Sequence, residues 1–412
     1  MAYAKQKKGS LGMNTKYIES RKSHRRLIGI LLVCCMALTL VMGIQIGRSS
    51  NHDDAPNYNI TLSYGGGAPN STIQSGSTAS QASYTIFRDG VTYFARNGTT
   101  GTIDYQSANA SWVVNAAIAS FPIQGGSLYF TTGTYYFSNS IVIRKPDITI
   151  EGTNDQTTIF WLNAYANCSL ILISSTTLIN FIYIENLELW GNRGSEGGKQ
   201  SCGINITAYA GDIFIQNVFI DDFLNSSIFV SPVTSHIWNL WIQDCHLEGN
   251  GQHGIMLNAN SNGIHYVYIA DNCIFANSGN GIEILNDNGR DIDIEGCTIW
   301  GNYGHGILLY GAEYTNIVGN QIFDNSYGSK STHDGICIGE YSGKNSKFIT
   351  IVGNTINDEG FTNTQRYGIN IENSTSSLTI VGNDLKGNNV AGMHISSGAA
   401  KNSCIASNLG TS

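Results

Sequence analysis

The chain has 412 residues, of which 13% are charged and 47 are glycine, and its formal net charge is -8. Because so few residues are ionic, most of the surface must be Asn, Ser, Thr, Gly and aromatic side chains. An acidic balance, with a sequence pI near 5.5, argues against nucleic acid as a partner.

The N-terminus is basic and then apolar. Residues 1–26 carry eight cations, and the apolar run Leu27–Ile46 of about 20 residues is long enough to span a bilayer. Its basic flank should stay in the cytoplasm. The alternative is a cleaved secretory signal, but its apolar core is usually shorter and ends in a small-x-small site, which is missing here. We therefore expect a cytoplasmic tail at 1–26, a transmembrane signal anchor at 27–46, and export of everything that follows.

Residues 47–83 are rich in Gly, Ser, Thr and Asn, which is typical of a flexible tether. Asn-x-Ser/Thr sequons permit N-glycosylation of an exported chain, as in a cell-surface glycoprotein. They lie at Asn59, Asn70, Asn97, Asn109, Asn167, Asn205, Asn225 and Asn373.

Residues 84–160 alternate short β-like runs with one Ala-rich segment. The segment Ala110–Ser120 has a helical pattern, and Ser111 could cap it. An amphipathic helix there would cover the apolar end of a stack of strands.

From Ile182 onward the chain repeats a Gly-Ile-x-Ile phrase with a period mostly in the twenties, followed by an Ile-x-Ile-x-x-Asn or -Cys phrase and a polar turn. Strand alternation points the isoleucines inward and the intervening residues outward. A repeat of this length without helical periodicity predicts a solenoid, here with three short strands per coil. The Asn or Cys at each bend should form a hydrogen-bonded ladder from coil to coil.

The succession of residues 84–160 resembles the beginning of pectate-lyase superfamily proteins. Its parts are Tyr84–Gly90, Trp112–Ile118, Gly125–Tyr135, Ile141–Ile143 and Ile148–Gly152. The resemblance implies that 84–412 is a right-handed parallel β-helix, a pectin-lyase-like solenoid with an N-terminal capping helix. With the apolar run, the expected fold class is all-β plus a single transmembrane helix. The superfamily contains lyases, hydrolases, epimerases, tailspikes and proteins without known activity, so fold does not select function.

Motifs of the known enzymes do not fit. Gly304-His305-Gly306 resembles a polygalacturonase motif, with Asp221 and Asp222 as its aspartates, but these lie several coils away. His305 also occupies the same repeat slot as His253 and Asn280. The arginine pattern of pectate lyases is missing as well.

A different site follows from stacking the coils. The outward residues of successive Ile-x-Ile strands predict an aromatic, substrate-binding stripe of Tyr183, Phe214, Trp241 and Tyr268. Beside it, Asp244 and Asp271 should lie roughly 5 Å apart, the separation that retaining glycosidases use. Two close carboxylates raise one pKa, as a general acid requires, and His246 could join them. In the structural alternative, these aspartates bond turn amides and the rings only stabilise neighbouring strands.

The sequence also gives expectations about metal binding and about the cysteines. No cofactor is expected, except that Glu283, Asp287, Asp291, Asp293 and Glu295 could hold Ca²⁺. Aligning Leu170 with Ile204 stacks Cys168 on Cys202 at disulfide distance. Cys245 and Cys297 lie two coils apart and should be buried thiols in the bend ladder.

These observations predict an exported, membrane-anchored β-helix protein whose partner is polysaccharide or a cell-surface glycan. If it is an enzyme, it is a glycoside hydrolase or polysaccharide lyase that uses Asp244, Asp271 and His246. The alternative is a non-enzymatic adhesin or envelope structural protein.

Overall fold

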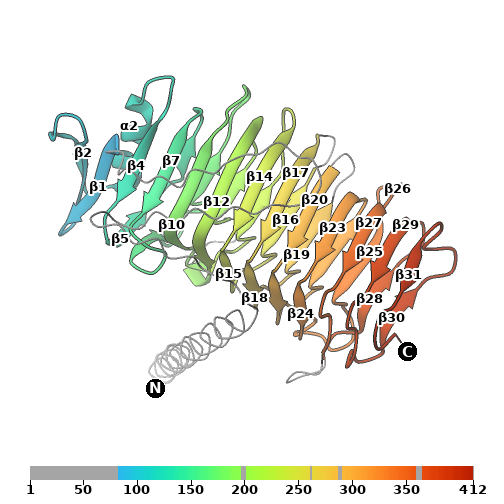
Figure 1. The fold of residues 1–412 in the computed structure, drawn as a ribbon. Helices are drawn as coiled ribbons and strands as arrows, with labels where there is room; N and C mark the ends of the chain where they lie inside the picture. Colours follow the sequence, from blue (N-terminus) through green and yellow to red (C-terminus); the bar gives the residue numbers. More distant parts are fainter. Residues whose placement is uncertain (1–81, 196–200, 260–261, 286–289, 359–363, 412) are drawn as a thin grey trace, which may run out of the picture. The chain divides into compact units, whose positions relative to one another are not determined.

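The computed structural model describes residues 82–195, 201–259, 262–285, 290–358 and 364–411, which form a solenoid of stacked parallel strands (Figure 1). One coil runs through β14 (Ile237–Gln243), β15 (His246–Glu248) and β16 (Ile255–Asn258). Each strand pairs with its counterpart one coil away, so the predicted three-strand repeat is confirmed.

The first strands of the coils form the broad face in the foreground of Figure 1. They are β4 (Gly126–Phe130), β7 (Ile148–Gly152), β10 (Ile182–Trp190), β12 (Ala210–Asp221), β14, β17 (Ile264–Ala270), β20 (Arg290–Glu295), β23 (Glu313–Val318), β27 (Lys347–Val352), β29 (Ser376–Val381) and β31 (Cys404–Ala406). We call their outward side the first face.

A bend separates these strands from a second set, β5 (Gly133–Phe137), β8 (Thr158–Leu162), β15, β18 (Cys273–Phe275), β21 (Thr298–Trp300) and β24 (Gln321–Phe323). β10 and β12 continue through the bend and pair with members of both sets.

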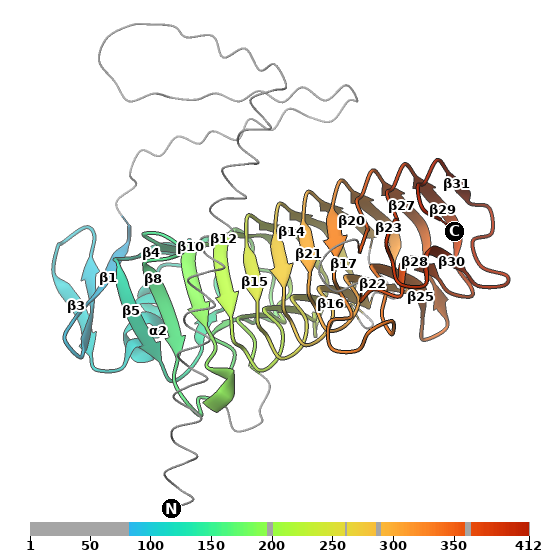
Figure 2. The same ribbon diagram turned by 90° about the horizontal axis from the view of Figure 1, so that it is seen from below.

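The third strands form a separate sheet, seen in Figure 2 along the opposite side of the solenoid. They are β6 (Ile141–Ile143), β9 (Ile171–Ile173), β11 (Ile204–Ile206), β13 (Ile228–Val230), β16, β19 (Ile282–Leu285), β22 (Ile307–Tyr310), β25 (Ile336–Tyr341), β28 (Tyr367–Ile371) and β30 (Ala391–Ile395). A two-residue strand, β26 (Lys344–Asn345), pairs with β25. The outward side of this sheet is called the third face.

Isoleucines and leucines from all three strand sets fill the interior. Ile242, Leu247 and Ile255, one from each strand of a coil, are fully buried. Each such side chain contributes about 2–3 kcal/mol relative to exposure, so the repeat itself supplies the core.

Residues before the first complete coil close one end. The strands β1 (Tyr84–Asp89), β2 (Thr92–Asn97) and β3 (Ile103–Ser107) pair antiparallel in order. The predicted helix is α2 (Ala110–Ser120), which buries Val113, Val114 and Ile118. Its N-cap is Asn109 rather than Ser111: the Asn109 side chain accepts the Trp112 amide, whereas Ser111 is buried and donates to the Asn139 carbonyl.

Two side-chain ladders run along the corners of the solenoid. At the predicted bend position, Asn272 accepts the Cys245 amide at 2.9 Å and Asn320 accepts the Cys297 amide at 2.9 Å, which confirms the first ladder. A second ladder follows the short strands, through Asn250, Asn277, Asn302, Asn325, Gln365 and Asn388. These amides satisfy backbone groups that the turns leave unpaired.

One part of the expected fold class is wrong. In the described part of the chain, no helix is long and apolar enough to cross a membrane. The only α-helix there, α2, has 11 residues, which at 1.5 Å per residue covers roughly half of the hydrocarbon thickness. The fold is therefore an all-β parallel solenoid with one short helix. Leu27–Ile46, to which the transmembrane prediction referred, lies outside the described residues.

Candidate functional site

The structure places the predicted aromatic stripe on adjacent coils of the first face. Tyr183 pairs with Phe214, Phe214 with Trp241, and Trp241 with Tyr268 in the strand registers. The corresponding ring centroids are 4.8, 6.2 and 4.9 Å apart. The coil register deduced from the isoleucines is therefore correct in this region.

The rings of the stripe are stacked from Tyr183 to Trp241, with 22° between Phe214 and Trp241, and the stacking ends at Tyr268. The rings of Tyr183 and Phe214 are nearly parallel, at 6°, so each covers one face of the other. Trp241 and Tyr268 are inclined at 58°, and their faces are not stacked on each other. A sugar ring packs on an aromatic face, so Trp241 and Tyr268 are the better placed pair for binding a glycan.

Asp244 and Asp271 also lie on adjacent coils, directly after the paired residues Gln243 and Ala270. Both are exposed, and both have left-handed backbone conformations, with φ of 52° and 55°. Other residues of this column are Asn217, Gly296 and Gly319, also at positive φ. Asn, Asp and Gly are the residues that tolerate this conformation, which gives the aspartates a structural reason to be there.

The two carboxyl groups nevertheless influence each other. Burial raises the pKa of Asp271, and the charge of Asp244 raises it further. The Asp271 carboxylate lies over Gly296, where an added Cβ would be 2.3 Å from its Oδ1. The Asp271 carboxyl therefore keeps its proton to a higher pH than an isolated aspartate does.

His246 lies past the bend, in β15. Its ring is between those of Phe219 and Phe275, at 4.7 and 5.1 Å, and its Nε2 is 3.8 Å from Glu248. The bend at the buried Cys245 separates it from Asp244 along the chain, so His246 belongs to the next face of the coil.

A row of polar side chains runs beside the aromatic stripe. It was not predicted from the sequence. Glu151, Glu185, Gln216 and Gln243 are paired in register, two residues after the aromatic positions. Burial raises the pKa of Glu185, and the neighbouring Glu151 charge raises it further. Carboxylates and amides beside apolar rings provide the hydrogen-bonding groups that sugar hydroxyls need.

The third face carries a network of buried polar residues. His253, Asn280 and His305 occupy the same slot on successive coils, as predicted, two residues before the paired isoleucines of β16, β19 and β22. Each accepts a backbone amide of the next coil, at 3.1, 2.7 and 2.9 Å. Glu283 accepts from the Asn280 side chain at 2.6 Å and lies 3.2 Å from His253. This slot therefore works as a third ladder.

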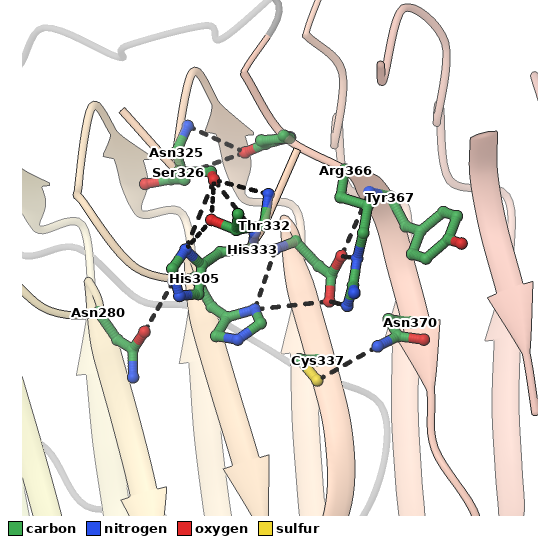
Figure 3. Close-up of polar contacts among 12 residues, drawn as sticks. Asn280, His305, Asn325, Ser326, Thr332, His333, Cys337, Arg366, Tyr367 and Asn370 are labelled. Atoms are coloured by element: carbon green, nitrogen blue, oxygen red, sulfur yellow. Dashed lines mark hydrogen bonds and ion pairs between the residues drawn. The ribbon is translucent and has the colours of Figure 1, made fainter. Parts of the chain in front are cut away.

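Figure 3 shows the end of this ladder, around His305, Cys337 and Arg366. Arg366 donates two hydrogen bonds of 2.8 Å to Asp334, which is fully buried. Burial lowers the pKa of His305 to about 4, so its ring is neutral near pH 7. Since its Nδ1 accepts the Asp334 amide, the proton is on Nε2.

Ligand atoms of His305, Asp334 and Cys337 all lie within 4.8 Å of one another, as in a metal site. Their bonding does not suit a metal. The His305 lone pair and both Asp334 oxygens already have donors, and burial raises the pKa of Cys337, so the thiol stays protonated. A cation would also face the Arg366 charge. The cluster is a hydrogen-bonded ion pair.

The acidic residues suggested for Ca²⁺ are not gathered in one place. Glu283 lies on the third face, whereas Asp293 and Glu295 lie in β20 on the first face, where they accept from Asn316 and Tyr268. Asp287 lies outside the described residues.

The predicted alignment of Cys168 with Cys202 is shifted by one residue. Ile204 pairs with Ile171 rather than with Leu170, so Ser169 is opposite Cys202. The disulfide stays a prediction. Cys245 and Cys297 are buried in the bend ladder, as expected, and burial raises the pKa of each thiol to about 12.

Comparisons with known proteins agree with this architecture. Residues 227–409 match the family described as right-handed beta helix region. No curated protein matches the sequence. ORF18 of Geobacillus virus E2 is similar in structure over 74% of this chain and 66% of its own, with 14% identity and a TM-score of 0.53.

Two further solved structures resemble the solenoid. The lidless DFA-IIIase of Arthrobacter chlorophenolicus A6, in complex with GF2, aligns over 67% of this chain and 77% of its own, at 14% identity and a TM-score of 0.52. The A-module of the Azotobacter vinelandii mannuronan C-5 epimerase AlgE6 aligns over 73% and 95%, at 18% identity and a TM-score of 0.48. Identities this low establish the shared fold alone.

Proposed function

Because the chain folds as a parallel β-helix and its residues 227–409 match the family described as right-handed beta helix region, we propose that it binds polysaccharide on the first face of the solenoid. The observation that carries this proposal is the aromatic stripe with the parallel row of Glu185, Gln216 and Gln243 beside it. Apolar ring faces and planar hydrogen-bonding groups in adjacent rows complement the two kinds of surface that a sugar presents. The basic and apolar segments of residues 1–46 support export, so the glycan would be extracellular.

Trp241 should be the main contact, since its ring is half-buried and inclined to that of Tyr268. We expect Trp241→Ala to weaken binding of the full-length protein roughly tenfold, the loss typical of one good aromatic contact. Binding would be measured on a glycan array and with soluble polygalacturonate, alginate, xylan and β-glucan.

Trp300→Ala is the matched control. Trp300 is also stacked between aromatic neighbours, at 4.7 and 6.0 Å, but it lies past the bend in β21. It should lower the melting temperature without changing glycan binding. The proposal is wrong if no polysaccharide in the panel binds, or if Trp241→Ala and Trp300→Ala have equal effects.

The protein could also cleave the bound polysaccharide, and the neighbouring carboxyl groups of Asp244 and Asp271 support this reaction. Asp271 has the raised pKa that a general acid needs, and Asp244 is its neighbour. If the bound polysaccharide is hydrolysed or eliminated, Asp244→Asn should abolish turnover and leave binding intact, because Asn tolerates the left-handed backbone at this position. Reducing-end and unsaturated-product assays would detect the two reactions. Unchanged turnover in this variant would exclude Asp244 from the chemistry.

Binding without turnover is the second function that a specific observation favours. Asp244 and Asp271 share their column with Asn and Gly residues at positive φ, as a purely structural turn would require. An adhesin or envelope component would then bind the same glycans as above and give no product in either assay.

A further inference from the structure

A bulge recurs near the start of the first-face strands β12, β14, β17, β20, β23, β27 and β29. The bulged residue does not take part in the pairing of adjacent strands. For example, Asn239 and Tyr266 lie between the pairs Trp238–His265 and Leu240–Val267 and are left out of the ladder. Its backbone is left-handed in coil after coil, and we call this set the bulge column. Its members are Phe181, Asp212, Asn239, Tyr266, Asp291, Tyr314, Phe348 and Ser377.

Four members of the bulge column are aromatic, which is unusual for this backbone: Phe181, with φ of 61°, Tyr266, Tyr314 and Phe348. Tyr266, Tyr314 and Phe348 have φ of 55°, 50° and 56°. Asn and Asp adopt such values readily, but for a bulky side chain they are strained. Strain of this kind persists where the surrounding structure imposes it, and it is concentrated at functional sites.

All four side chains are also exposed: Phe181 at 46%, and Tyr266, Tyr314 and Phe348 at 59%, 40% and 43%. Core packing therefore does not explain them. Tyr314 and Phe348 stack on each other at 4.8 Å and 18°, but Tyr266 has Asn239 and Asp291 as its neighbours in the bulge column and lacks that compensation. Contact with a ligand would offset the cost of exposing these aromatic rings to water and of straining their backbone.

The bulge column runs parallel to the aromatic stripe, two residues earlier in each strand. The stripe ends at Tyr268 on β17, and Tyr266 lies on the same strand, two residues earlier. Tyr314 and Phe348 follow on β23 and β27, which lie side by side with β17 and β20 in Figure 1. From β10 to β27 there are six coil steps of about 4.8 Å, or roughly 29 Å.

Polar groups flank the exposed rings. The Arg290 guanidinium lies 5.7 Å from the Tyr314 ring centre, and the Lys347 ammonium lies 5.7 Å from that of Phe348. Lys347 also pairs with Glu313 at 3.2 Å. Charged and hydrogen-bonding groups around aromatic faces match the chemistry of the stripe itself.

We propose that Tyr266, Tyr314 and Phe348 extend the glycan-binding surface, so that one linear polysaccharide chain lies along the solenoid axis from β10 to β27. This inference rests on the proposed function and specifies its ligand as a long polymer rather than a short oligosaccharide. Affinity should therefore increase with chain length until the ligand spans the track.

The test uses Tyr266→Asn and Tyr314→Asn in the full-length protein. Asn occupies the bulge column naturally at Asn239, so these changes remove the ring and relieve the backbone. The probe is the panel polysaccharide that the protein binds, size-fractionated into long chains and short oligomers. We expect affinity for long chains to fall roughly three- to tenfold, affinity for short oligomers to stay constant, and the Tyr266→Asn melting temperature to stay level or rise.

Ser377→Asn is the control, since it has the same backbone conformation one coil beyond the proposed track. It should leave both affinities unchanged. If Trp241→Ala weakens binding but neither tyrosine variant does, the extension is wrong and the proposed function stands. If the tyrosine variants lower the melting temperature and leave long-chain affinity unchanged, the rings are structural and the extension is also wrong. If Trp241→Ala has no effect, the proposed function itself fails.

Discussion

Asp358 is a fully buried carboxyl group near the C-terminal end of the solenoid. It accepts the Asp324 amide at 2.9 Å and the Gln365 amide at 2.7 Å. Burial raises its pKa to about 7, and the hydrogen bond and charge of the Asp324 carboxyl contribute to the increase. Asp358 therefore keeps its proton at mildly acidic pH.

This residue predicts a pH dependence of stability. The pKa of Asp358 is higher in the folded state than its ordinary value of 3.8, so the folded state binds the proton more tightly. Its contribution is complete below about pH 4 and is lost as the pH rises toward 7. Asp324→Asn replaces the second carboxyl by an amide that can donate to Asp358, so this variant should lose less stability between pH 4 and 7 than the parent.

The measurement is the difference in melting temperature between variant and parent across that range. A difference is needed because His305 acts in the opposite direction: its pKa is lowered to about 4, so its contribution is lost as the pH falls from 6.5 toward 4. The exposed Asp89 serves as control, and Asp89→Asn should leave the profile unchanged. Parallel profiles for Asp324→Asn and the parent would show that the Asp324 carboxyl does not raise the pKa of Asp358.

At the scale of strands, the repeat made most of the fold predictable. Isoleucines at alternate positions define which side of a strand is buried, and each coil pairs only with its neighbours. That is sufficient to align Trp241 with Tyr268 and to place Asn272 at the bend, as observed. The alignment failed at Cys168 because Leu170 and Ile171 are both fully buried, so alternation does not define the register there.

Three other features of the strands were not predicted, and two of them had no signal in the repeat. The bulge at Tyr266 places an aromatic residue in a conformation that its side chain disfavours, so composition could not reveal it. The ion pair of Arg366 with Asp334 joins residues 32 positions apart on adjacent coils, in a slot that other coils fill with His or Asn. The row of Glu185, Gln216 and Gln243 was detectable, because it repeats two residues after the aromatic positions.

At the scale of the molecule, the solenoid should behave as a one-dimensional array. Asn277 in the second ladder donates to the Leu247 carbonyl at 3.1 Å and to Asn302 at 3.0 Å, and it accepts from Asn250. Asn277→Ala leaves buried partners without hydrogen bonds, each worth about 1–3 kcal/mol. We expect it to lower the free energy of unfolding by ~3 kcal/mol, whereas Ser278→Ala at the exposed neighbouring position should change little.

Double variants test whether coupling is confined to neighbours. Asn302 bonds directly with Asn277, so the two Ala substitutions share the contact that each removes, and the double variant should lose less stability than the sum of the singles. Asn383 belongs to the bend ladder several coils away, where it bonds with Asn354 and Asn408. Asn277→Ala and Asn383→Ala should therefore add within about 0.5 kcal/mol in denaturant titrations. Strong coupling between these distant positions would mean that stability is shared through the whole stack rather than passed from coil to coil.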